Sequence, residues 1–111
     1  VTGACMLVRK ELWQQLDGFD ESLRVSYNDV DFCLRLLEIN YAVIYTPFAK
    51  LYHLESISRP KTIADMSTEE LVEFQRESDF LRRRHLKYFK EGDPYYNPNL
   101  TLRLENYSLD I

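Results

Sequence analysis

The chain has 111 residues, of which 45% are hydrophobic and 14% aromatic, and a formal net charge of −4. A chain of this length suits one compact domain that buries about 65% of the surface it exposes when unfolded. The acidic balance argues against a general nucleic-acid-binding protein, because such proteins present a basic face to the phosphates. We also expect no signal peptide and no membrane-crossing segment, since no run of about 18 apolar residues occurs.

The two cysteines bear on the cellular compartment of the protein, and the first residue bears on whether the chain is part of a longer one. Cys5 and Cys33 both lie in apolar patterns, which predicts reduced core residues and not the disulfide framework of a secreted protein. We therefore expect a cytoplasmic protein. Because Val1 already lies inside an apolar stretch, we also expect this chain to be part of a longer enzyme.

The N-terminal part of the sequence predicts short strands around two helices. Residues 2–8 have the pattern of a buried strand, and residues 10–16 that of a short helix that ends at Asp17-Gly18. Phe19 follows as an apolar anchor in a loop. Two further extended segments are expected at residues 41–45 and 49–53.

A second helix is predicted over residues 29–39. Its signals are Asn28 as the N-cap, two acids in the first turn, and an apolar stripe at Val30, Cys33, Leu34 and Leu37. Asp29 and Asp31 are about 200° apart around such a helix, so they need separate roles. Asp31 has Arg35 four residues later, which favours a structural ion pair.

Asp29 has no such partner, and two interpretations stay open. Its carboxylate can point into a cleft as a general base, or it can only complement the dipole of the helix. The Asp29-Val30-Asp31 sequence also matches an Asp-x-Asp metal motif. We reject the metal interpretation, because that motif belongs at the end of an apolar strand, where both carboxylates reach one ion.

The C-terminal part predicts one long helix over residues 68–91. Its signals are a Ser67/Glu70 capping box, a Met66/Leu71 hydrophobic staple and Gly92 beyond the end. Residues 93–99 are rich in turn formers, and residues 100–104 alternate like an edge strand. We expect this tail to be docked on the body.

A basic patch on that helix allows two interpretations. It consists of Arg82, Arg83, Arg84, His85 and Lys87. The patch can contact an anionic lipid surface or a lipid-linked diphosphate. Alternatively it is a solvated helix face, balanced by Glu69, Glu70, Glu73 and Glu77.

Several ordered motifs resemble the C-terminal, acceptor-side half of family 2 glycosyltransferases, of the type that makes bacterial cell-surface polysaccharides. They are residues 2–9, Gly18-Phe19-Asp20-Glu21, residues 28–35, Pro47-Phe48-Ala49, residues 53–59 and the tail 93–99. The resemblance implies an α/β protein, the C-terminal portion of a GT-A fold. Residues 1–60 would form the acceptor and catalytic-base half and residues 61–111 a C-terminal helix with a docked tail, while the N-terminal donor-nucleotide half would be absent.

The resemblance also implies a reaction. A sugar would be transferred with inversion from a nucleotide-diphospho-sugar to a hydroxyl of a glycan or lipid-linked acceptor, helped by Mn or Mg. Asp29 would be the base that takes the acceptor proton. Asn28 departs from the acidic residue that usually precedes this base, and His53 would lie near the diphosphate and the metal.

The remaining implied contacts are to substrate. They would be made by Thr2, Gly3, Ala4, Asn28, Asp31, Ser56, Ser58 and Arg59, the last three on a loop that either closes over phosphate or stays solvated. Alone, this chain is expected to be inactive and to self-associate through uncovered apolar surface, with a peripheral contact at the inner face of the membrane.

Two other functions compete with the enzyme. One is a noncatalytic sugar-recognition or interaction module, in which Tyr95 and Tyr96 stack on a glycan and Asp29 only ends a helix. The other is a metal-binding domain that uses Asp29, Asp31 and His53, which we rank last because the ligand spacing matches no dedicated site.

Overall fold

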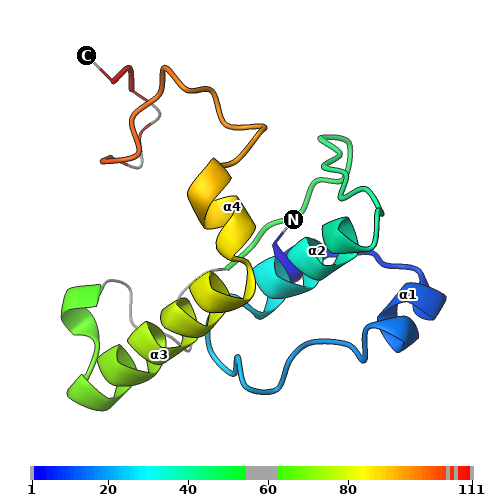
Figure 1. The fold of residues 1–111 in the computed structure, drawn as a ribbon, viewed down its shortest axis with the longest axis horizontal. Coiled ribbons are helices and arrows are strands. Elements are labelled where there is room, and N and C mark those ends of the chain that lie inside the picture. Colours follow the sequence, from blue (N-terminus) through cyan, green and yellow to red (C-terminus); the bar gives the residue numbers. More distant parts are fainter. Residues whose placement is uncertain (1, 55–62, 105, 107, 111) are drawn as a thin grey trace.

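The computed structural model describes residues 2–54, 63–104, 106 and 108–110. Its helices are α1 (Lys10–Gln15), α2 (Asn28–Glu38), α3 (Thr68–Arg84) and α4 (Leu86–Glu91), and short 3₁₀ turns occur at Gly3–Cys5 and Ile63–Asp65. The C-terminal end of α3 meets α2, and α1 lies on the side of α2 that faces away from α3 (Figure 1). Helix α4 bends away from the end of α3.

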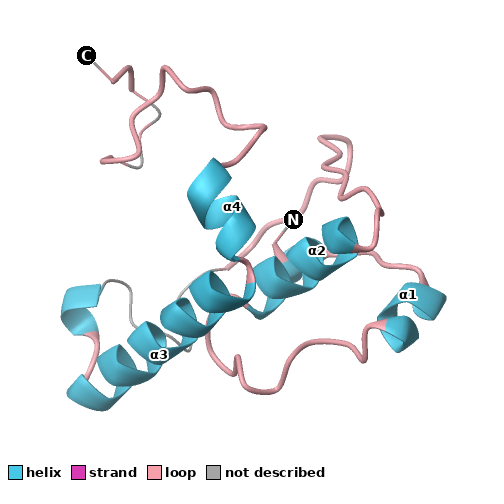
Figure 2. Ribbon diagram, in the orientation of Figure 1, coloured by secondary structure: helices cyan, strands magenta, loops and turns pink. Residues whose placement is uncertain are grey.

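No strand forms within the described residues, whose extended segments are drawn as loops in Figure 2. The strands expected at residues 2–8, 41–45, 49–53 and 100–104 are therefore wrong, and the α/β class is not confirmed. A strand requires a neighbour that completes its hydrogen-bond ladder. The one pairing found in the described part is an isolated antiparallel bridge between Leu100 and Leu109.

The core joins α1, α2 and the loop between them. Leu12, Phe32 and Leu36 are buried at its centre. Trp13, Phe19 and Phe32 pack their rings at centroid distances of 5.0 to 5.6 Å, with mostly edge-on geometry. The prediction that Phe19 anchors its loop is confirmed.

The predicted buried face of α2 is right only at Cys33. Val30 is 42% exposed, and Leu34 and Leu37 are only half-buried. The buried side chains are Asp31, Phe32, Cys33, Arg35 and Leu36. The apolar stripe did not identify most of the buried side chains, because α2 packs on two sides, against apolar residues around α1 and against polar groups on α3.

The long C-terminal helix begins as predicted and then breaks. Ser67 and Glu70 form the predicted capping box at the start of α3. The expected single helix 68–91 is interrupted at His85, which ends α3 and precedes α4. Gly92 ends α4 with a left-handed φ of 79°.

The cysteines and the tail also differ from expectation in part. Neither cysteine forms a disulfide with a described residue, and Cys33 is buried as predicted, but Cys5 is exposed. The hydrogen bonds of the described tail residues, including the bond from the Tyr96 hydroxyl to the Thr101 carbonyl, stay within the tail. Figure 1 shows the tail leading away from α4, so its docking on the body stays a prediction.

Gly18 is the glycine whose lack of a side chain the core requires. Its φ is +65°, and a Cβ there would lie 2.8 Å from the Trp13 ring, whereas a Cβ on Gly92 would meet nothing within 4 Å. Gly18→Ala should therefore cost the penalty of a left-handed backbone, about 1–2 kcal/mol, and about 1–3 kcal/mol more because the indole must move. In a Trp13→Ala background, where the ring is absent, the same substitution should cost only the backbone penalty. Denaturant unfolding of Gly18→Ala in both backgrounds would measure the difference, and equal losses would contradict the proposed clash.

Candidate functional site

A buried carboxylate on α2 joins three parts of the chain. Asp31 has no exposed surface, and its Oδ2 accepts a hydrogen bond of 2.7 Å from Arg35 Nε. Its Oδ1 lies 2.8 Å from His85 Nε2 and 3.4 Å from the nearest guanidinium nitrogen of Arg84. The predicted Asp31–Arg35 pair is confirmed. As described, Asp31 has no surface to offer a substrate, so its assignment to substrate binding is not supported by its position.

Arg35 and His85 extend this network to other elements. Arg35 donates two hydrogen bonds of 2.7 Å to the carbonyl oxygens of Leu16 and Gly18, which fixes the loop after α1. The second ring nitrogen of His85 lies 2.7 Å from Glu38 Oε1. Because a carboxylate only accepts hydrogen bonds, His85 satisfies Asp31 and Glu38 together when both of its ring nitrogens carry a proton.

Asp29 lies at the first turn of α2 and faces the N-terminal segment. Its Oδ2 accepts a hydrogen bond of 2.7 Å from the Gly3 N–H, and its Oδ1 accepts one of 2.9 Å from the Val30 N–H. A Cβ on Gly3 would lie 3.3 Å from the Asp29 Cβ, so the two backbones approach closely. The structure thus brings together Asp29 and Gly3, two of the predicted site residues.

The start of α2 differs from the predicted cap. Tyr27 is the N-cap and adopts a left-handed φ of 66°, which is uncommon for a residue other than glycine. Its ring packs on Phe74 of α3 at a centroid distance of 5.6 Å. Asn28 is already helical, and its side-chain oxygen accepts a hydrogen bond of 2.8 Å from the Asp29 N–H.

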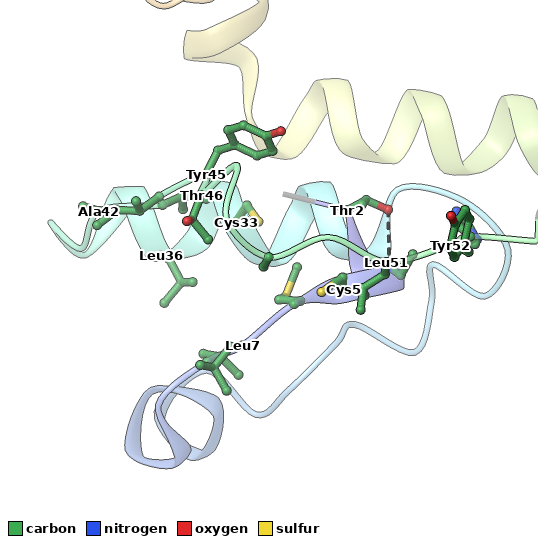
Figure 3. A pocket seen from close by; sticks show the side chains of 17 residues that line it. Thr2, Cys5, Leu7, Cys33, Leu36, Ala42, Tyr45, Thr46, Leu51 and Tyr52 are labelled. Atoms are coloured by element: carbon green, nitrogen blue, oxygen red, sulfur yellow. Dashed lines mark hydrogen bonds between the residues drawn. The ribbon is translucent and has the colours of Figure 1, made fainter.

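A largely apolar pocket of about 620 Å³ opens beside this site (Figure 3). Its walls come from the N-terminal segment, from α2 and from residues 42–53. Thr2 and Ala4, the two neighbours of Gly3, line it, and so does His53. Thr2 also caps the first 3₁₀ turn, because its hydroxyl accepts a hydrogen bond from the Ala4 N–H.

The metal hypothesis finds no ligand cluster in the part of the chain that the structure describes. No group of three His, Cys, Asp or Glu residues lies close enough there to hold an ion. The metal-binding domain built on Asp29, Asp31 and His53 is therefore wrong. His53 alone cannot form a Mn or Mg site, so its contact with a metal stays a prediction. Ser56, Ser58 and Arg59 lie outside the described residues.

Sequence reasoning missed two buried polar residues on α3 and at its end. Glu77 is 0% exposed and His85 1%, although both were expected on a solvated face. The signal that could have found them is spacing: Glu77, Leu81 and His85 recur every four residues and share one side of the helix. Leu81 is buried at 4% exposure, which marks that side as the packed one.

The rest of the basic patch is on the surface. Arg82, Arg83 and Lys87 are exposed, as is Lys90 further along α4, and none of the four forms an ion pair with a described residue. Arg84 is also exposed, but it contacts the acids beside α2, with a 2.5 Å hydrogen bond to Asp20. Tyr95 is 89% exposed, while Tyr96 is half-buried.

The chain is similar to three kinds of curated protein. It is 38% identical over 110 residues to the uncharacterized protein y4gI of Sinorhizobium fredii, a match that covers 98% of this chain and 12% of that protein. It is 36% identical over 102 residues to the O-antigen biosynthesis protein RfbC of Myxococcus xanthus, covering 92% of this chain and 7% of the relative.

A shorter match joins it to an N-acetylglucosaminyl-diphospho-decaprenol L-rhamnosyltransferase of Mycobacterium tuberculosis. That match is 36% identical over 53 residues, covering 48% of this chain and 17% of the relative. The chain therefore spans less than a fifth of each of these relatives. No family model matches it, and no solved structure matches it significantly.

Asp20 gives the site a pH dependence in acid. Hydrogen bonds from Ser22, with a further contribution from Arg84, lower the pKa of Asp20 from 3.8 to about 2. Its ionised form therefore stabilises the fold above pH 3.8, and this stabilisation is lost as the pH falls toward 2.

Wild type should thus lose more stability between pH 3.8 and pH 2 than Asp20→Asn, which does not titrate. Urea midpoints across the interval measure this. Exposed Glu21→Gln is the control, and parallel curves for Asp20→Asn and wild type would contradict the prediction.

Proposed function

We propose that this chain is the acceptor-side part of a longer glycosyltransferase that builds a bacterial cell-surface polysaccharide. The proposal rests on the position of Asp29 and is supported by the names of two groups of relatives. The donor would be a nucleotide-diphospho-sugar and the acceptor a hydroxyl on a glycan or a lipid-linked saccharide. Asp29 would be the general base of an inverting transfer.

The observation that carries this proposal is the way Asp29 is held. Its two oxygens accept one backbone N–H each, from Gly3 and Val30. An ionised carboxylate has about four acceptor positions, so two remain for an incoming hydroxyl. No described residue forms an ion pair with Asp29, and its half-buried side chain still reaches the surface.

The proposed chemistry uses that free acceptor capacity. The acceptor hydroxyl would give its proton to Asp29 while its oxygen attacks the anomeric carbon. The bond from that carbon to the diphosphate would break, and the nucleoside diphosphate would leave from the opposite face. Mn or Mg would supply charge neutralisation at the diphosphate, and the ligands other than His53 would come from outside the described residues.

The other site residues take supporting roles. Gly3 would keep the N-terminal segment close to Asp29, and Thr2 and Ala4 would line the adjoining pocket. His53 lines the same pocket and would face the donor side. Asp31 would hold α2 in place without touching substrate, since it is fully buried.

Asp29→Asn in the full-length protein should test the base. Asparagine keeps an oxygen for the Gly3 N–H, so the local fold should survive while proton acceptance is lost. We expect kcat to fall about 10²–10⁴-fold with unchanged donor affinity. Turnover of a panel of nucleotide-sugars and isothermal titration with the active donor would measure both.

The matched control is Glu21→Gln, which removes an exposed acid from the neighbouring loop and should leave kcat unchanged. If Asp29→Asn turns over as fast as wild type, Asp29 is only a helix-end charge. The noncatalytic sugar-recognition module would then be the better description.

We further propose that the exposed basic residues of α3 and α4 contact anionic lipid at the inner face of the membrane. Leu86 and Phe89 are about half exposed among these charges, which gives the surface both apolar and basic character. No helix in the described part is long and apolar enough to span a membrane. The proposed contact is peripheral and additional to the acceptor site.

Vesicle binding tests this contact. Each basic residue near an anionic surface adds about 1 kcal/mol, so the triple variant Arg82→Gln, Arg83→Gln, Lys87→Gln should bind phosphatidylglycerol vesicles about 100-fold more weakly. Arg9→Gln, Lys10→Gln, Lys50→Gln removes the same charge elsewhere and should bind nearly as wild type. Equal losses in both triple variants, or no binding by wild type at low salt, would refute the contact.

A further inference from the structure

A buried glutamate on α3 holds the backbone that leads into the site. Glu77 has no exposed surface. Its Oε1 accepts hydrogen bonds of 2.7 Å from the Arg24 N–H and 3.1 Å from the Val25 N–H, and its Oε2 accepts one of 2.6 Å from the Ser26 N–H. Three consecutive backbone donors thus converge on one carboxylate more than fifty residues away in the sequence.

These three donors lie immediately before α2. Residues 24–26 form no regular secondary structure, so their N–H groups have no ladder or helix to satisfy them. Tyr27 follows in its left-handed conformation, and α2 begins at Asn28. Asp29 is therefore three residues beyond the last N–H that Glu77 binds, with no flexible segment between them.

The contact between Glu77 and the loop requires both carboxylate oxygens, and enough hydrogen bonds to offset the burial of the charge. Burying a carboxylate is costly unless hydrogen bonds replace its hydration, and here three backbone donors do so. A side chain that provides only one acceptor oxygen would leave at least one of these N–H groups without its partner. The loop would then adopt other conformations, which would change the direction of the first turn of α2.

A second contact from α3 holds the same loop further upstream. Arg76 donates a hydrogen bond of 2.6 Å to the Ser22 carbonyl, and Phe74 packs on the Tyr27 ring. Leu23, between these points, is 1% exposed. The loop 22–27 is therefore fixed against α3 along its whole length, and Glu77 supplies its central, fully buried attachment.

We propose that Glu77 is a positioning residue for Asp29: by binding three consecutive N–H groups it sets the first turn of α2, and thereby the distance from the Asp29 carboxylate to an acceptor hydroxyl. This inference rests on the proposed function. It assigns to α3 a role in catalysis without contact with substrate. It also explains why an acid occupies a helix face that is otherwise packed by Leu81.

The experiment compares Glu77→Gln, Asp29→Asn and Glu69→Gln in the full-length protein. Glu69→Gln is the matched control, because Glu69 lies on the same helix but is exposed. All are assayed with nucleotide-sugars on which wild type turns over, at a temperature where circular dichroism shows each variant fully folded. Glu77→Gln should lower kcat about 10- to 100-fold with a donor KM within about twofold of wild type.

Amide hydrogen exchange gives a readout that needs no donor. Glu77→Gln should speed exchange in a peptide covering residues 24–31 at least about tenfold, while a peptide from α1 exchanges as in wild type. Glu77→Asp, which keeps the charge but shortens the reach, provides a second variant if Glu77→Gln folds poorly. It should show the same local change in exchange.

The outcomes separate the two proposals. Wild-type kcat in folded Glu77→Gln together with an inactive Asp29→Asn would overturn the role of Glu77 and leave the proposed function standing. A fully active Asp29→Asn would overturn both. Unchanged exchange in residues 24–31 of the Glu77 variants would overturn the positioning role whatever the kinetics show.

Discussion

The structure depends on the buried cluster around Asp31. Three acids, Asp20, Asp31 and Glu38, face three basic groups, Arg35, Arg84 and His85, and each basic group contacts at least one of the acids. With both ring nitrogens of His85 protonated, the charges balance. Asp31, Arg35 and His85 are the buried members of this cluster, and removing one partner of a buried pair typically costs about 3–5 kcal/mol, because another buried charge is then left unpaired.

This cluster replaces the sheet that the sequence led us to expect as the centre of the fold. Helix α2 lies between an apolar side, where Phe32 and Leu36 meet α1, and a polar side, where Asp31 meets His85. Arg35 spans the two sides, since its guanidinium binds Asp31 and also the carbonyl oxygens at the end of α1. Hydrogen bonds of charged side chains thus add to the apolar contact between α1 and α2 and join α2 to the end of α3.

What could be predicted from the sequence was mostly local. The capping box of α3, the Asp31–Arg35 pair and the packing of Phe19 on Trp13 join residues within one or two helical turns of one another in the sequence, and all three were found. Gly3 and Asp29 were assigned to one site by a family resemblance, and the hydrogen bond between them was not predicted.

Interactions between distant residues could not be predicted in the same way. The strands failed because pairing depends on a partner segment that no local pattern specifies. Glu77 and His85 were misplaced because acidic and basic residues on a helix usually face water, and only their spacing to Leu81 suggested otherwise.

The sequence separation of these contacts has a consequence for synthesis. Glu77 binds the loop across 51 to 53 residues, and His85 binds Asp31 across 54. During translation from the N-terminus, the segment containing Asp29 leaves the ribosome well before either residue that fixes it. A chain cut anywhere between Arg35 and Glu77 would retain residues 28–35 in its sequence and yet lack the contacts that hold them, so this part of the site becomes ordered only when α3 is complete.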